Sequence, residues 1–206
     1  MKEKKIQQIT NNMEKYINYR ELKGRQSAAI ENGFYFEALL IDYALIEDRM
    51  QSYLYHLGIL EDRLVLEMSE IANIYIKPII LEYKRNEEKA RIDLKKLEDK
   101  MKIVRCILKW VNESDRITDV DYLITIKRQC ESMDIGLMYD LLERLGEWKG
   151  YRNEVIHGLM NKNIDSLNLN LKFNAIEGRK IADELDTQLK IMKGKDEIRK
   201  SAGMKC

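Results

Sequence analysis

Apolar residues recur at steps of three and four along most of this chain, which is the spacing of one face of an α-helix. The pattern is strongest between Phe34 and Leu57, where two apolar stripes run side by side. One stripe comprises Phe34, Ala38, Ile41, Leu45, Ser52 and Tyr55, and the other comprises Leu39, Tyr43, Ile46, Met50, Tyr53 and Leu57. Two adjacent stripes predict a long helix that is buried against two neighbours. Gly58 is predicted to end it, since glycine accepts the left-handed backbone of a helix C-terminus.

Weaker versions of the same pattern predict further helices in the rest of the chain. They span 1–22, 87–110, 119–133, 136–159 and 175–193, while 60–80 is ambiguous around Pro78. We expect connections over 24–33, which two glycines bracket, and over the asparagine-rich 161–174. No segment shows the convincing alternation of a strand. The sequence therefore predicts an all-α fold, a helical bundle of about five to seven helices with up-down topology.

The composition agrees with this fold class. Only one proline and ten glycines occur among 206 residues, and so few helix breakers favour long helices. Hydrophobic residues make up 45% of the chain and charged residues 34%, which is typical of a globular protein with a real core. We predict an N-terminal helix and linker over 1–32, the bundle over 33–193 and a flexible basic tail over 194–206.

Charge and cysteine usage exclude several classes of protein. The formal net charge of +1 argues against a general nucleic-acid coat or a membrane-surface protein, although it allows a local basic groove. Cys106, Cys130 and Cys206 are widely spaced without a CxxC motif, so we expect reduced thiols and neither disulfides nor a zinc site. The chain has no apolar run of membrane-spanning length and no signal-peptide core, which predicts a cytoplasmic protein.

Two charged residues occupy positions where the helical pattern expects apolar ones. The seam of the 136–159 helix runs Leu141, Leu145, Trp148, Arg152, Ile156 and Leu159. A charge on such a seam costs free energy unless it is paired or faces a solvated cleft. Asp48 holds an equivalent position on the 34–57 helix. Asp48 and Arg152 could therefore form a structural ion pair, or Asp48 could orient Arg152 inside a pocket, with Glu47 assisting from the flank.

The end of the 136–159 helix also carries one of the two histidines, His157. It lies four residues after Asn153, hence on the same side of the helix, and Lys149 lies one turn earlier. An imidazole transfers protons near neutral pH and a guanidinium holds a phosphate, which together suffice to cleave RNA without a metal. Tyr151 can stack on a base or pack at the rim of the core.

The second histidine belongs to a polar strip on the first long helix. His56 follows Asp42 and Arg49 at steps of seven residues. We interpret this strip as part of a surface or an interface.

An all-α bundle with Arg-Asn-x3-His near the end of a long helix resembles the HEPN superfamily, the helical nucleotide-binding and RNase domains of prokaryotic defence systems. The matching residues are Arg152, Asn153 and His157. The resemblance implies a homodimer whose paired motif helices form one composite site that cleaves RNA without a cofactor. It assigns proton transfer to His157 and phosphate stabilisation to Arg152. Asn153 then orients the phosphate or His157, and Asp48 or Glu47 holds Arg152.

Three functions follow as hypotheses. The first is a metal-independent endoribonuclease of a toxin or defence type, for which an antitoxin or another partner protein is expected. The second is a non-catalytic helical module that binds a nucleotide or a protein. The third is an all-α nucleotide pyrophosphohydrolase, which needs paired carboxylates for Mg²⁺. The nearest such pairs, Glu67-x2-Glu70 and Glu131-x2-Asp134, stand far apart in the sequence.

Overall fold

A computed structural model describes residues 9, 11–83, 93–113, 118–131, 133–158, 161, 163–168, 170–193 and 197–204. Over these residues every regular element is a helix, so the all-α prediction is confirmed. The helices are α1 (Asn12–Glu31), α2 (Tyr35–His56), α3 (Glu70–Tyr83), α4 (Leu97–Glu113), α5 (Asp121–Glu131), α6 (Ile135–Gly158), α7 (Ile164–Asn168), α8 (Leu171–Lys193) and α9 (Glu197–Ser201). Within these ranges no helix is both long enough and apolar enough to cross a membrane.

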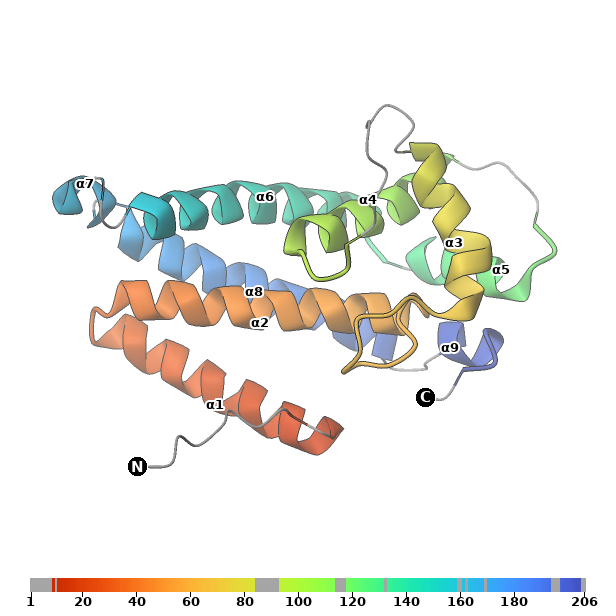
Figure 1. The fold of residues 1–206 in the computed structure, drawn as a ribbon, viewed down its shortest axis with the longest axis horizontal. Coiled ribbons are helices and arrows are strands. Elements are labelled where there is room, and N and C mark those ends of the chain that lie inside the picture. Colours follow the sequence, from red (N-terminus) through yellow and green to blue (C-terminus); the bar gives the residue numbers. More distant parts are fainter. Residues whose placement is uncertain are drawn as a thin grey trace.

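Four long helices form the body of the molecule (Figure 1). α1 and α2 make an antiparallel pair, as do α6 and α8, and α2 packs most closely on α8. α2 and α8 run in the same direction, so the bundle combines antiparallel consecutive pairs with a parallel central contact. The shorter helices α3, α4, α5 and α9 gather at one end, and the C-terminus of α6 lies with α7 at the other end.

Most residues of the two predicted apolar stripes on the central helix α2 are buried, although Phe34 at its N-cap is 62% exposed. Leu39, Ile46, Met50 and Tyr53 have at most 1% of their surface exposed, and the helix contacts α1, α4 and α8. After the C-cap at Leu57, the chain turns at Gly58 with φ of 69°. That left-handed backbone is favourable for glycine, so the predicted end of the helix is confirmed.

The predicted linker at 24–33 is wrong for most of its length. α1 begins after Asn11, whose side chain caps the helix by accepting a hydrogen bond from the Glu14 amide at 2.9 Å. It continues through Gly24 to Glu31, and only 32–34 connect it to α2. Packing explains the difference, because α1 buries Gln26 and Ala29 against the bundle, and tertiary contact outweighs the weak helix preference of one glycine.

Two other predicted irregular segments contain helices. The expected connection at 161–174 includes α7 and the first turn of α8. The expected flexible tail at 194–206 includes α9, in which Ile198 is 2% exposed and Arg199 is 1% exposed. The rest of that tail, 194–196 and 205–206, lies outside the described residues. An arginine buried this deeply means that α9 is an integral part of the fold.

Arg199 joins α9 to the end of α2 and the turn that follows it. Replacing Arg199 with lysine is expected to lower the free energy of unfolding by about 2 kcal/mol. Its guanidinium donates to the carbonyl oxygens of Tyr55, Leu60 and Glu61 at 3.0–3.1 Å and lies 3.7 Å from the Tyr55 ring centroid. Arg199→Lys keeps the charge but replaces the two donating nitrogens of the guanidinium with one ammonium nitrogen, which cannot occupy both positions. Urea unfolding measures the loss, with exposed Lys200→Arg as the control. Equal stability of Arg199→Lys and the wild type contradicts the prediction.

Candidate functional site

The C-terminal half of α6 holds the candidate residues on a firmly anchored helix. Leu141, Leu145 and Trp148 are at most 2% exposed. The indole Nε1 of Trp148 donates to the carbonyl oxygen of Asn174 on α8 at 2.8 Å. The buried side chains and this hydrogen bond fix the rotation of α6 about its axis. The core therefore sets the direction in which the side chains of the following turns point.

Arg152 is held by an aromatic ring and an amide. Its guanidinium carbon lies 4.0 Å from the centroid of the Tyr43 ring on α2, and Nη1 donates to Oδ1 of Asn153 at 3.1 Å. Nε is buried without a hydrogen-bond partner. Arg152 forms no ion pair with any carboxylate of the described residues. The side chain is therefore positioned, while no carboxylate of the described residues neutralises its positive charge.

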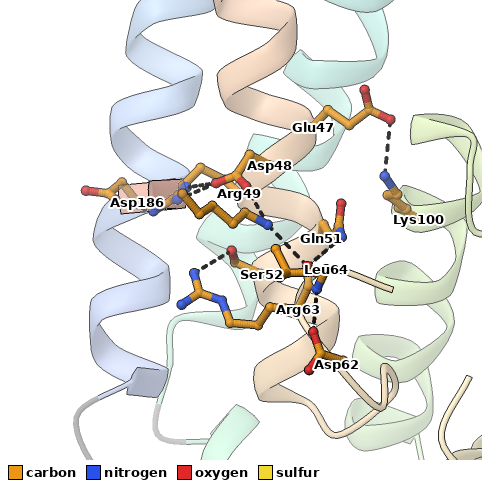
Figure 2. Close-up of polar contacts among 11 residues, drawn as sticks. Glu47, Asp48, Arg49, Gln51, Ser52, Asp62, Arg63, Leu64, Lys100 and Asp186 are labelled. Atoms are coloured by element: carbon orange, nitrogen blue, oxygen red, sulfur yellow. Dashed lines mark hydrogen bonds and ion pairs between the residues drawn. The ribbon is translucent and has the colours of Figure 1, made fainter. Parts of the chain in front are cut away.

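The predicted partnership of Arg152 with Asp48 or Glu47 is wrong. Asp48 binds Arg49 and, at 2.8 Å, Lys15 of α1, whereas Glu47 accepts from Lys100 of α4 at 3.1 Å. Figure 2 shows Glu47 directed toward α4 and Asp48 on the side of α2 that faces Asp186 of α8. Consecutive residues on a helix point about 100° apart, so the two carboxylates serve different neighbours.

His157 and Asn153 line the same open hollow, as their four-residue spacing predicts. The hollow is formed by Gly150, Asn153, Glu154, His157, Gly158 and Asn161. His157 is exposed and Asn153 is half-buried. Arg152 donates to the Asn153 amide oxygen but does not itself line the hollow. The arrangement places an imidazole and an amide on one hollow, with the guanidinium hydrogen-bonded to the amide.

Lys149 and Tyr151 already have partners within the chain. Lys149 forms an ion pair with Glu98 of α4, and burial lowers the pKa of its ammonium group. The Tyr151 hydroxyl donates to the carbonyl oxygen of Leu167 in α7 at 3.1 Å. Burial, with Glu154 adding to it, raises the pKa of Tyr151. Both residues hold α6 against neighbouring helices, which is a structural role alongside the predicted contact with substrate.

Within the described ranges, no group of three or more histidine, cysteine, aspartate or glutamate side chains is arranged to hold a metal ion. Glu67, Glu70, Glu131 and Asp134 are all exposed. Two carboxylate pairs on facing helices, which the pyrophosphohydrolase hypothesis requires, are therefore not found there.

The interpretation of the polar strip of α2 as part of a surface or an interface is wrong, because its residues are buried inside the fold. Asp42 is fully buried, and Arg49 and His56 are each 6% exposed. Arg49 lies at the base of a basic pocket that also includes Lys15, Tyr19, Arg20 and Arg63, none of which the sequence indicated as a site. The signal that could have found it was the run of basic residues along 15–25 beside two tyrosines, on a helix that contacts α2.

Comparisons with protein-family profiles, with curated protein sequences and with solved structures find no match to this chain.

Proposed function

We propose that this protein is a metal-independent endoribonuclease of the HEPN type, with a composite site formed by two copies of α6. The observation that carries the proposal is the surface at the end of α6. There His157 is accessible, Asn153 shares its hollow, and Arg152 is hydrogen-bonded to Asn153 without a carboxylate partner among the described residues. An accessible imidazole beside a positioned, unneutralised guanidinium suits a phosphodiester substrate.

A second copy of the chain supplies an arginine opposite His157, which a single α6 does not provide. Arg152 and His157 are five residues apart, so they point about 140° apart around the helix axis. Gly150 and Gly158 border the hollow, and an added Cβ at Gly150 would meet nothing within 4 Å. Such small residues allow another helix to approach closely. A two-fold pairing of the α6 ends then brings each histidine toward the arginine of the other copy.

The reaction follows from the chemistry of these groups. One His157 takes the proton of the ribose 2′-hydroxyl, whose oxygen attacks the adjacent phosphorus. The 5′-oxygen of the next nucleotide leaves and takes up a proton from the other His157. Arg152 stabilises the additional negative charge on the phosphorus oxygens in the transition state. The products are a 2′,3′-cyclic phosphate and a 5′-hydroxyl. An RNA substrate suits the cytoplasmic location that we propose, and a toxin of this kind is expected to have a partner antitoxin.

The test is RNA cleavage in EDTA by the wild type, His157→Gln and the control Glu143→Gln, which alters an exposed residue about two helical turns before Gly150 at the start of the hollow. Because His157 is exposed, the variant is expected to fold normally. We expect His157→Gln to reduce cleavage about a hundredfold or more, since it removes general acid–base catalysis. Light scattering on the same samples checks the dimer, and a cyclic-phosphate end group identifies the reaction.

Three results contradict the proposal. These are cleavage that His157→Gln leaves unchanged, cleavage that requires Mg²⁺, and a wild type that cuts neither structured nor single-stranded RNA. The last result favours the non-catalytic module that binds a nucleotide or a protein.

A further inference from the structure

A second site lies on the face of α2 that is turned toward α1 and α8. It is a pocket of about 340 Å³, which is within the range of small-ligand sites. Its walls are α1, α2, α8 and the loop that follows α2. Four separate parts of the chain thus converge on one hollow, and none of its lining residues belongs to α6 or to the hollow at His157.

The pocket carries a surplus of positive charge. Six cationic side chains line it, namely Lys15, Arg20, Lys23, Arg49, Arg63 and Lys190. Among the residues that the structure describes, three carboxylates bind to members of this set, namely Asp48, Asp183 and Asp186. Pairing therefore leaves an excess of three positive charges in a confined space of a protein whose net charge is only +1. A concave surface of one sign concentrates anions.

The cations at the base of the pocket are fixed in place. The Arg49 side chain is 7% exposed and donates to Asp186 at 2.8 Å (Figure 2). The Lys15 side chain is 12% exposed and binds Asp48 at 2.8 Å. Burial by itself favours a neutral Asp48, but Arg49 and Lys15 outweigh it and hold the pKa of Asp48 below its usual value. The carboxylate therefore stays ionised and orients both cations before any ligand arrives.

Several hydrogen-bond donors in the pocket lack an acceptor. The Tyr19 hydroxyl and Nε of Arg63 are buried without a hydrogen-bond partner. The hydrogen bond from Nη2 of Arg63 to Oγ of Ser52 is long, at 3.3 Å, and the guanidinium carbon lies 5.8 Å from the Tyr55 ring centroid. Arg20 forms no ion pair with any described residue. Unpaired buried donors are costly, and a ligand with many acceptor oxygens would satisfy them.

We propose that this pocket binds a small polyphosphate anion, the shared chemistry of nucleoside triphosphates and inorganic tripolyphosphate. Guanidinium groups are suited to phosphate oxygens because they present several donors in one plane. A short polyphosphate matches both the charge surplus and the size of the pocket, whereas an RNA strand requires a groove that continues beyond it. Tyr16 is 60% exposed at the rim, where its ring is able to stack on a nucleobase.

Isothermal titration calorimetry with ATP and, separately, with tripolyphosphate tests the proposal on the full-length protein. Arg20→Gln and Arg63→Gln are compared with Arg25→Gln, which alters an exposed arginine on the same helix outside the pocket. We expect both pocket variants to bind at least tenfold more weakly than the wild type and Arg25→Gln to bind normally. Because Arg20 is exposed, its replacement keeps the test valid even if Arg63→Gln unfolds.

The ligand series separates the two sources of the polyphosphate. If ATP binds more tightly than tripolyphosphate, and Tyr16→Ala removes this difference, the pocket is a nucleotide site. If ATP and tripolyphosphate bind equally tightly, the pocket recognises the polyphosphate group alone. The proposal is overturned if neither compound binds at millimolar concentration, if Arg25→Gln weakens binding as much as Arg20→Gln, or if a short RNA displaces the ligand and binds more tightly. His157→Gln retains binding if the pocket is separate from the proposed ribonuclease site.

Discussion

Asp42→Asn is expected to remove most of the pH dependence of stability between pH 5 and pH 8. Asp42 is fully buried, and its Oδ1 accepts from Nε2 of Gln26 at 2.7 Å while Oδ2 has no partner. Burial raises the pKa of Asp42 to about 8, with Asp183 adding to the shift and Gln26 and Arg179 opposing it. The carboxyl group is therefore protonated in the folded protein at neutral pH.

The sign of the effect follows from proton binding. Between the ordinary aspartate pKa near 4 and the folded value of about 8, the folded protein holds a proton that the unfolded chain has lost. Stability therefore falls as the pH rises through this window, by about 4 kcal/mol between pH 5 and pH 8. Asparagine has nearly the same shape and cannot ionise. The variant should match the wild type at pH 5 and exceed it at pH 8.

Urea unfolding at pH 5, 6, 7 and 8 measures this prediction for the wild type, Asp42→Asn and Asp140→Asn. Asp140 is exposed on α6, so its replacement controls for the loss of one carboxylate from the surface. A wild-type stability that stays constant from pH 5 to pH 8, or a decline that Asp42→Asn does not reduce, rules out the assignment.

Gly178→Ala is expected to destabilise the protein by about 3 kcal/mol, because α8 meets α2 and α6 at this glycine without room for a methyl group. An added Cβ would lie 2.8 Å from Oδ2 of Asp42 and 2.8 Å from two ring atoms of Trp148. Both neighbours are buried, and Trp148 is also held by its hydrogen bond to Asn174. Neither can move away cheaply, so α8 must shift.

Gly24→Ala is the matched control for Gly178→Ala in the same unfolding measurement. Gly24 lies inside α1, and a Cβ there would meet nothing within 4 Å. The control should gain up to about 1 kcal/mol from the higher helix preference of alanine. If Gly178→Ala is instead as stable as the wild type, α2, α6 and α8 can move apart at this position to make room for a methyl group.

Local patterns in the sequence were enough to predict the all-α class, the long helix α2 and the placement of two site residues. The two stripes of 34–57 predict α2 nearly to its ends, since each turn repeats the same relation between spacing and face. The same relation places Asn153 and His157 on one side of α6, where both line one hollow. What they do there stays a proposal, because a three-residue pattern specifies a placement and not a reaction.

Only the tertiary structure decided which charged groups meet. Asp48 was predicted to bind Arg152, but it binds Lys15 and Arg49, because α1 covers that side of α2. The basic pocket arises from four parts of the chain, up to 175 residues apart between Lys15 and Lys190. A helical period fixes the direction of a side chain around its own axis, but the choice of neighbouring helix depends on the packing of the whole core.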